Sequence, residues 1–549
     1  MSKRTRQFGR GCLSLFVLVS GTAAAGDVTM QSGLSVSGTL TDNVTRGQIQ
    51  SDGSTASKGD FITEIRPSIG GRSQGAGLKY DFNYELSAVE YFHDTARNAV
   101  NNRFRLNGTA EVVEDRFLLD FRSAYFQVAN APSADTLNDP LLGSGGYSNV
   151  GTLTLTPIWR EHLGSFADSE MTGTLGLTTT SDQSDNVGGA SASASDSTVL
   201  GIDWRLSNGR SSGNTGWSVV YSRSVEGYAD GNLGNDEREH AEASVRQGIS
   251  REWALLGRVG LENNSTHDIS EQEAANGNYW SGGLGWTPSR VLGLDAWYGS
   301  RDKELTLNWN PSERTSLVLS WRDRAVGLVT GPSWNLDFRH RTAYSDWTAR
   351  YSEEVTNSQG VARKDSNFLS FVNPQTGEVV YFDPATGRLL PASSAFSLNN
   401  ESFLRKRFSL GNSYQRGHSQ FNSNVFHESR EYEASGRKET SLGLDASWSW
   451  QFAPRTRSVL AVNWERVSGD DSSSGSGSGS DSTGSSGDSD YLTGRIGLSH
   501  QLSADADALI EYAHTTSDGG SGGFGSSGGG SSSQSYDENR LTLSINMRF

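Results

Sequence analysis

The feature that most constrains the fold of this chain is an alternation of apolar and polar residues with a period of two. In the stretch LKYDFNYELS, residues 78–87, every second residue is apolar and the residues between are polar. Successive side chains of a β-strand point to opposite faces, so this stretch predicts a strand with one apolar and one polar face. The pattern recurs at 60–70, 103–112, 292–298, 305–309, 334–339, 442–450, 492–498 and 541–549. We therefore predict an all-β chain.

Two β architectures present such strands: a soluble sandwich with one covered face, or a barrel that spans a membrane. The alternation keeps its regularity along nearly the whole chain of 549 residues, which favours the barrel. The mean hydropathy of −0.53 and the hydrophobic content of 34% agree with this interpretation, because lipid-facing residues occupy only every second position of a barrel strand. The sequence has no apolar run of about 18 residues, so we expect no helical membrane span.

The connections between the predicted strands are of two kinds, which alternate along the chain. Short connections, such as 113–116, 287–290 and 452–456, are followed by longer polar ones, such as 42–59 and 128–149. Bacterial outer-membrane barrels have short periplasmic turns and longer outer loops. We predict a large antiparallel transmembrane β-barrel of about 24 strands. An even number of strands would place both termini in the periplasm.

The N-terminus has the features of a secretory signal peptide. Basic residues precede an apolar run, and Ala23, Ala24 and Ala25 offer small residues for cleavage. We assign residues 1–25 to the signal peptide and residues 26–549 to the barrel. Cys12 is the only cysteine and lies in the signal peptide, so we expect no disulfides in the mature chain. The first strand begins soon after the cleavage site, which leaves no room for a plug domain.

Three loops depart from the strand pattern. The loop insertion around 356–400 contains the turn signals NPQTG and DPATG on either side of an apolar stretch, VVYF. We expect a small β element there, standing on the outer rim. The Ser/Gly-rich loops around 469–490 and 518–535 have too few apolar residues to order themselves, so we expect them to be disordered.

The last strand ends the chain on an aromatic residue. It resembles the terminal strand of bacterial outer-membrane barrels, which the barrel-assembly machinery reads. On this basis the predicted assembly signal is the apolar face of that strand: Leu541, Leu543, Ile545, Met547 and Phe549.

The polar faces of the strands are the candidate functional surface, because they would point into the lumen of a barrel. Both charge signs occur on them, which suits a hydrated passage or an internal salt-bridge lattice but does not name a substrate. The candidate lumen-lining residues are Glu64, Arg66, Lys79, Asp81, Glu85, Arg103, Arg105, Glu111, Asp337, Arg339, Arg405, Arg407, Asp445 and Arg495.

The sequence does not indicate a catalytic, metal-binding or phosphate-binding site. The nine histidines are scattered without zinc-type spacing, and no Lys-Ser/Thr pair follows the Gly/Ser runs as in a phosphate loop. We expect no catalytic residues, no metal or cofactor site and no nucleic-acid partner. The protein is not expected to be an enzyme.

Several segments carry a resemblance to a known family. The segments YWSGGLGWTPSRVLGLDAWYG, WNLDFRHRTAYSDWTARYSEEVTNSQ, LRKRFSLGNSYQRGHS and REYEASGRKETSLGLDASWSWQFAPRT are similar to the PEP-CTERM system-associated outer-membrane β-barrel proteins. The N-terminal stretches GLSVSGTLTDNV, DFITEIRPSIG and GAGLKYDFNYEL are similar to the opening of that family. The Ser/Gly-rich loops depart from it. The resemblance implies residence in the outer membrane and a link to exosortase and exopolysaccharide loci.

These observations lead to one main hypothesis and two alternatives. The main hypothesis is an outer-membrane barrel of a Gram-negative bacterium that serves the export of exopolysaccharide or PEP-CTERM surface matrix, as a passive conduit or its scaffold. The alternatives are a general diffusion porin and a structural or adhesive barrel with a closed lumen. Expected partners are outer-membrane lipid, lipopolysaccharide, the barrel-assembly machinery, exopolysaccharide and periplasmic export proteins. The polymer, the state of the lumen and the oligomeric state are left open.

Overall fold

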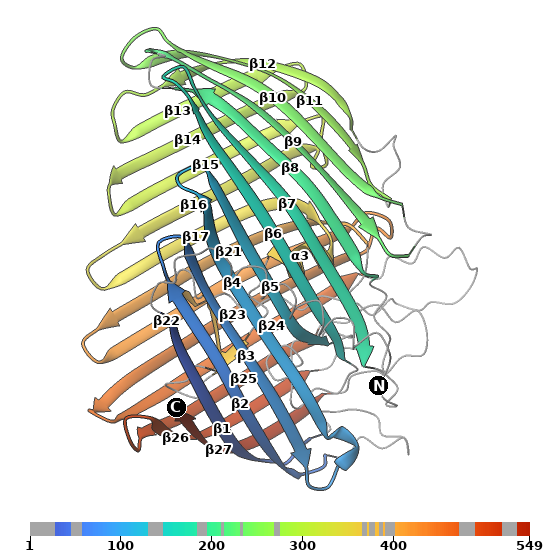
Figure 1. Ribbon diagram of the computed structural model, residues 1–549, viewed down its shortest axis with the longest axis vertical. Coiled ribbons are helices and arrows are strands. Elements are labelled where there is room, and N and C mark those ends of the chain that lie inside the picture. Colours follow the sequence, from blue (N-terminus) through green and yellow to red (C-terminus); the bar gives the residue numbers. More distant parts are fainter. Residues whose placement is uncertain are drawn as a thin grey trace.

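The computed structural model is a closed antiparallel β-barrel of 24 strands (Figure 1). It describes residues 28–44, 57–129, 147–183, 195–209, 213–230, 234–267, 275–364, 370–372, 379–383, 388–389, 401–470, 489–518 and 535–549. The predicted signal peptide lies outside the described residues. Each barrel strand pairs with the next one along the chain, and β27 pairs with β1 to close the wall. The predicted fold class and strand count are confirmed.

The barrel strands alternate in direction around the wall and differ in length. The first half of the wall contains β1 (Val28–Thr41), β2 (Asp60–Gln74), β3 (Leu78–Tyr91), β4 (Ala99–Val113), β5 (Phe117–Ala129), β6 (Tyr147–Leu163), β7 (Ala167–Gln183), β8 (Ser197–Asn208), β9 (Thr215–Tyr228), β10 (Asp236–Gly248), β11 (Trp253–Ser265) and β12 (Gly277–Trp286). The second half contains β13 (Leu292–Gly299), β14 (Asp302–Ser312), β15 (Thr315–Arg324), β16 (Gly331–Arg341), β17 (Ser345–Thr356), β21 (Phe403–Arg416), β22 (Ser419–Tyr432), β23 (Lys438–Ala453), β24 (Thr456–Asp470), β25 (Ser489–Gln501), β26 (Ala506–Asp518) and β27 (Tyr536–Arg548).

The two faces of the wall differ in polarity, as β27 illustrates. Leu543 lies on the outer face with 56% of its surface exposed, whereas Asn546 is buried on the inner face at 6%. Apolar side chains are likewise exposed on the outer faces of other strands, among them Ile69, Tyr84, Leu200, Trp280 and Ile496. An outward apolar belt and an inward polar wall are what a transmembrane barrel requires.

The connections form two different rims. Short turns join β4 to β5 and β21 to β22, and the second of these contains Gly417 with φ 58°. A positive φ of this kind is readily adopted only by glycine. The strand ends that the longer connections join, including those after β1, β5, β7 and β17, lie at the opposite rim. Both described ends of the chain lie at the short-turn rim, where the Phe549 N–H donates to the Ser32 carbonyl at 2.9 Å.

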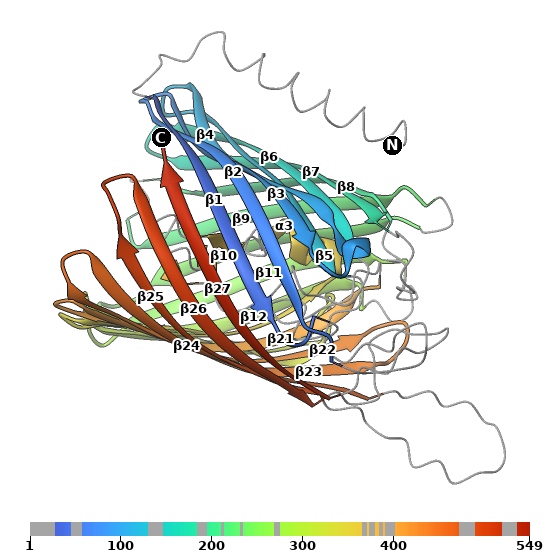
Figure 2. The same cartoon turned by 90° about the horizontal axis from the view of Figure 1, so that it is seen from below.

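The insertion between β17 and β21 contains a helix and a small sheet. The helix α3 spans Ser358–Lys364, and β18 (Ser370–Val372), β19 (Val379–Asp383) and β20 (Arg388–Leu389) form a three-stranded antiparallel sheet. The β element predicted within 356–400 is therefore present. The first part of the insertion lies inside the barrel, where α3 contacts β6 and β7 (Figure 2). The expectation that the β element stands on the outer rim stays a prediction.

The described residues also include the short 3-10 helix η2 (Thr95–Arg97) in the loop after β3. No helix in the described ranges is long and apolar enough to cross a membrane. Most of the two Ser/Gly-rich loops, residues 471–488 and 519–534, lies outside the described residues. The ends of the predicted loop ranges belong to strands instead, since β24 continues to Asp470 and β26 to Asp518.

Candidate functional site in the barrel lumen

The predicted lumen residues on β2, β3 and β4 form a series of contacts along the inner wall. Glu64 is the most buried of them. It accepts hydrogen bonds from the hydroxyls of Ser87 at 2.6 Å and Ser37 at 3.4 Å, and it lies 3.5 Å from Arg66. Neutral hydroxyls and one guanidinium therefore stabilise this carboxylate within the wall.

Two looser ion pairs follow on β3 and β4. The Arg103 guanidinium lies 3.8 Å from Glu85, and that of Arg105 lies 3.9 Å from Asp81. Lys79 is placed on the same face of β3 as Asp81, nearer the short-turn rim. Glu111 has a local role, because it accepts a hydrogen bond from the Asp115 N–H at 2.8 Å in the turn after β4.

The predicted residues of β16 are also accessible from the lumen. Asp337 pairs with Arg350 of β17 at 3.2 Å, and both side chains are more than half exposed. Arg339 pairs with Asp346 at 3.0 Å. An ion pair as exposed as Asp337–Arg350 contributes little to stability, so these two side chains are accessible to a solute.

A third group lies on β21 and β22 around one buried carboxylate. Glu428 contacts Arg405 at 3.0 Å and Arg430 at 2.6 Å, and Arg407 also donates to it. The Arg407 guanidinium lies over the Phe426 ring at 5.0 Å. Glu428 and Arg430 were not among the sequence candidates, although their alternation with Val425 and His427 places them on the inner face.

The last two candidates lie on nearby strands of the wall. Asp445 of β23 accepts a hydrogen bond from Asn463 of β24. Arg495 lies on β25, and its Nε is buried without a hydrogen-bond partner among the described residues. The sequence candidates are thus distributed over separate sectors of the wall, and the structure does not gather them into one cluster.

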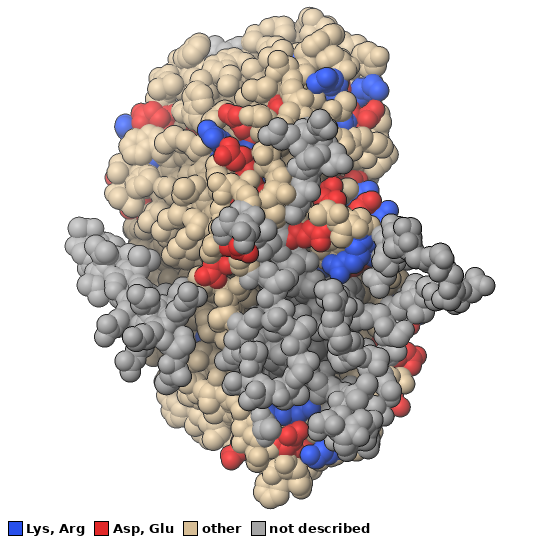
Figure 3. Space-filling model, turned by 90° about the vertical axis from the view of Figure 1, so that its right-hand side faces the viewer, with Lys and Arg blue, Asp and Glu red and all other residues tan. Residues whose placement is uncertain are grey.

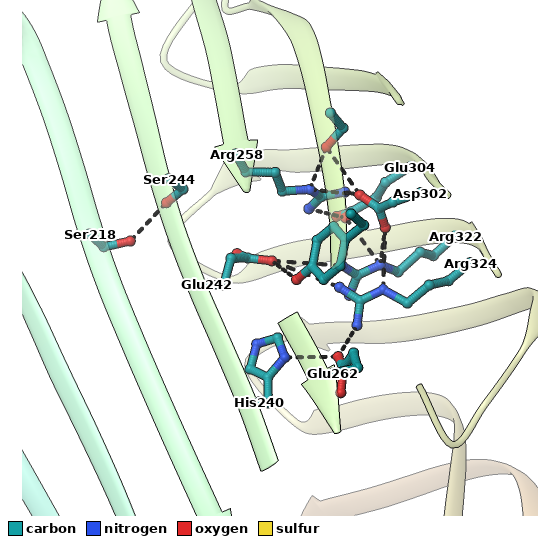
Figure 4. A network of polar contacts seen from close by, with 12 residues as sticks. Ser218, His240, Glu242, Ser244, Arg258, Glu262, Asp302, Glu304, Arg322 and Arg324 are labelled. Atoms are coloured by element: carbon teal, nitrogen blue, oxygen red, sulfur yellow. Dashed lines mark hydrogen bonds and ion pairs between the residues drawn. The ribbon is translucent and has the colours of Figure 1, made fainter. Parts of the chain in front are cut away.

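The densest cluster was missed by sequence reasoning (Figure 4). Its centre is Asp302 at the start of β14, whose side chain is 0% exposed. One Asp302 oxygen accepts from Arg322 Nε at 3.0 Å and Arg324 Nε at 3.3 Å, and the other accepts from Arg258 Nε at 2.8 Å. We call this cluster the narrow-end lattice; it comprises His240, Glu242, Arg258, Glu262, Tyr279, Ser281, Asp302, Glu304, Arg322 and Arg324.

Further carboxylates form ion pairs with the same arginines. Glu304 lies 2.7 Å from Arg258 Nη1, and Glu262 lies 2.6 Å from Arg324 Nη1. Glu262 also contacts the His240 ring at 2.8 Å. Because each buried charge has an opposite charge beside it, the lattice avoids the large cost of an unpaired buried ion.

The lattice shows how tightly the wall curves. Glu242 of β10 and Arg322 of β15 are five strand steps apart, or about 24 Å along a flat sheet with strands about 4.8 Å apart. Their charged atoms are nevertheless 3.9 Å apart. The strands β10–β15 therefore form a sharply curved end of the barrel, and the lattice fills its interior. We call this sector the narrow end.

The sequence contained part of the signal for this lattice. Leu305, Leu307 and Trp309 identify the outer face of β14, which places Glu304 on the inner face. The apolar residues on the outer face of the opposing strand β10 are Ala241, Ala243 and Val245, so its alternation is weak. No sequence pattern indicates that β10 and β15 meet across the lumen.

A second structure crosses the lumen near the long-loop rim. We call residues 357–364, which include α3, the strap. Arg363 of the strap donates to Glu226 of β9 at 2.6 Å, to Ser197 of β8 at 2.9 Å and to Thr178 of β7 at 3.0 Å. These partners lie on the inner wall opposite the strand from which the strap departs.

The long-loop rim carries both charge signs. Figure 3 faces this rim and shows basic and acidic side chains interspersed, with neither sign forming one continuous patch. No cluster of three or more metal-ligating side chains occurs in the part of the chain that the structure describes. The described residues visible at this rim therefore include charged groups of both signs.

No family model matches the sequence, and no curated protein matches it. Among solved structures, the chain is similar to the siderophore receptor PirA from Acinetobacter baumannii, with 9% identity, a TM-score of 0.46 and coverage of 96% of this chain and 81% of that one. It is also similar to the FrpB iron transporter from Neisseria meningitidis, with 8% identity, a TM-score of 0.42 and coverage of 94% and 82%. A variant of the ferric enterobactin receptor PfeA from Pseudomonas aeruginosa gives 10% identity, a TM-score of 0.44 and coverage of 96% and 82%.

At these identities and TM-scores the likenesses carry no argument about this chain. The fold rests on the strand pairing itself, which closes from β27 to β1. None of the comparisons bears on the resemblance to PEP-CTERM system-associated proteins, which stays a prediction.

Proposed function

We propose that this protein is an outer-membrane barrel that passes hydrated polar molecules through its lumen, in the service of exopolysaccharide or surface-matrix export. The observation that carries the proposal is the contrast between the two faces of a closed wall. Leucine, isoleucine and tryptophan side chains cover the outer face, whereas charged and hydroxyl side chains cover the inner one. A polar inner wall allows a hydrated solute to keep its hydrogen bonds along the path.

The choice of a carbohydrate polymer is supported by the resemblance to the PEP-CTERM system-associated barrels and by the neutral groups between the charges. The inner faces of β21, β22 and β23 carry Ser409, Ser413, Asn422, Asn424 and Ser447, and Asn422 lies opposite both Ser413 and Ser447. Hydroxyl and amide groups both donate and accept hydrogen bonds, so they suit sugar hydroxyls without binding them tightly.

The first experiment is a conductance measurement with the purified barrel in a planar lipid bilayer. A hydrated passage gives large, steady single-channel currents. A barrel that inserts, migrates as a folded species on unheated gels and carries no current, even after residues 358–364 of the strap are replaced by a Gly-Ser linker, contradicts the passage.

The second experiment asks whether the lumen is part of an export path. Single cysteines at Lys79, Asp81 and Asp337 would be labelled with a bulky water-soluble thiol reagent, and extracellular polysaccharide would be measured. The only native cysteine, Cys12, lies in the predicted signal peptide and does not compete. We expect labelling at all three positions and a loss of polymer outside the cell. Complete labelling with normal polymer output contradicts the export role and favours a general diffusion porin.

One observation favours a second candidate, a surface barrel with a closed lumen. Contacts cross the barrel both in the narrow-end lattice and at the strap, where Arg363 reaches Glu226. For such a scaffold, we expect no current across the planar bilayer. We also expect the water-soluble reagent not to label the cysteines introduced at Asp81 and Asp337.

A further inference from the structure

The strap is attached to two parts of the wall that are far apart around the barrel. On one side it reaches β7, β8 and β9 through Arg363. On the other side Val361 packs with Phe403 of β21 and Tyr432 of β22, and all three side chains are buried. Eight strands, β10 to β17, separate β9 from β21 in the wall. The strap therefore bridges the lumen.

The polar attachment is compact. Arg363 and Glu226 are 11% and 12% exposed, and their atoms lie 2.6 Å apart. Asn357 adds hydrogen bonds to the Tyr228 hydroxyl at 2.9 Å and to Glu226 at 3.3 Å. The side-chain amide of Gln359 donates to the Ser195 carbonyl. Glu226 is thus the wall group on which the charged contact depends.

The strand before the strap approaches the same wall. The Arg238 guanidinium of β10 donates to the Val355 carbonyl of β17 at 3.4 Å. Around the wall these strands are seven steps apart, or about 34 Å at about 4.8 Å per step. The strap and this contact together separate the narrow end from the rest of the lumen at the level of the long-loop rim.

The strap can leave without disturbing the barrel ladder. The strap begins after Thr356, which pairs with Phe403, so the backbone bonds between β17 and β21 do not involve it. The helix α3 has seven residues, and isolated helices shorter than about 12 residues are marginal in water. Its place is therefore set by the contacts of Arg363, Asn357, Gln359 and Val361.

We propose that the strap is a releasable constriction, which sets the size limit of the passage and which is latched to the wall by Arg363 and Glu226. The inference rests on the proposed hydrated passage and identifies what limits it. A narrow remaining path favours linear, flexible chains over compact solutes of the same mass. Release of the latch removes this constriction from the path.

The test compares Arg363→Ala and Glu226→Gln with the unchanged protein in planar bilayers and in liposome-swelling assays with sugars of increasing size. Each variant is expected to raise single-channel conductance by at least about twofold, since the barrier is a local narrowing. Each variant should also admit larger sugars. The exchange Arg363→Glu with Glu226→Arg restores the ion pair and is expected to return the conductance toward that of the unchanged protein.

The matched control is Lys438→Ala, which removes the Lys438–Glu431 ion pair at 3.5 Å near the same rim. These two residues alternate with the buried inner-face residues Glu439 and Arg430, so they lie on the outer face. The control is expected to leave conductance unchanged. Folding of every variant is checked by heat-modifiable migration on gels.

The possible outcomes distinguish failure of the strap proposal from failure of the proposed passage. A silent parent with a conducting Arg363→Ala variant supports a passage that the strap closes. A conducting parent whose folded latch variants match it in conductance and size limit overturns the strap proposal and leaves the passage intact. Silence of the parent, the latch variants and a variant with residues 358–364 replaced by a Gly-Ser linker overturns both.

Discussion

The narrow end and the seam between β27 and β1 are built from the same alternating strands but are stabilised differently. At the seam, nine consecutive residue pairs from Gly33–Arg548 to Thr41–Arg540 keep one register. The side-chain contacts described at the seam join adjacent strands, such as Thr39 with Thr542 at 3.1 Å. In the narrow end, Arg322 and Glu242 join strands that are five steps apart.

This difference shows that the closure of the sheet and the shape of the barrel depend on different interactions. Backbone hydrogen bonds close the sheet wherever strands run side by side, and they do not depend on which polar side chains point inward. The number of strands and their stagger set the circumference of the barrel. Contacts across the lumen affect the shape of the cross-section, because they hold strands that do not pair close together. Asp302 unites three arginines from two strands and so fixes the sharp bend.

The largest effect is expected for Asp302→Ala. Removal of this carboxylate leaves Arg258, Arg322 and Arg324 with too few acceptors, and the loss of one partner of a buried ion pair costs about 3–5 kcal/mol. Urea unfolding of the barrel in lipid would show the loss as a lower midpoint. Asp337→Ala is the matched control, because its partner Arg350 is exposed and the pair contributes less than about 1 kcal/mol. Equal losses for the two variants would show that the narrow end is not stabilised by its lattice.

The next effect concerns the two faces of the seam. Ile545→Arg puts a charge on the outer face of β27, which costs roughly 2–4 kcal/mol near the bilayer midplane. Asn546→Arg puts the same charge on the inner face, where we expect folding to be retained. The yield of the heat-modifiable folded species on unheated gels measures both. If Asn546→Arg proved as damaging as Ile545→Arg, the assignment of faces at the seam would be wrong.

The smallest effect is expected where the seam has only neutral contacts. Thr39→Val alone leaves the Thr542 hydroxyl without its partner, which costs about 1 kcal/mol. The double variant with Thr542→Val removes both polar groups and is expected to recover part of that loss. The same unfolding midpoint reports the difference. A loss as large as that of Asp302→Ala would mean that seam and narrow end depend on side chains equally.

The sequence predicted those features of the structure that depend on residues close together in the chain. The face of each residue could be predicted, because it depends only on the period of two; Glu64 and Leu543 lie where the alternation places them. The position of α3 could not be predicted. Its seven residues gain their place from Phe403, Tyr432 and Glu226, which are distant in sequence and join it only when the barrel closes.

The sequence by itself determined that this chain is a closed barrel of strands with an apolar and a polar face, because strand geometry turns a local pattern into two surfaces. It also determined the alternation of short turns and long loops. Only the tertiary structure decided that Asp302 lies among three arginines and that residues 357–364 bridge the lumen. The physical reason is that the inner wall brings together side chains from strands that never pair. Which of them meet depends on the curvature of the whole sheet and not on the residues beside them in the chain.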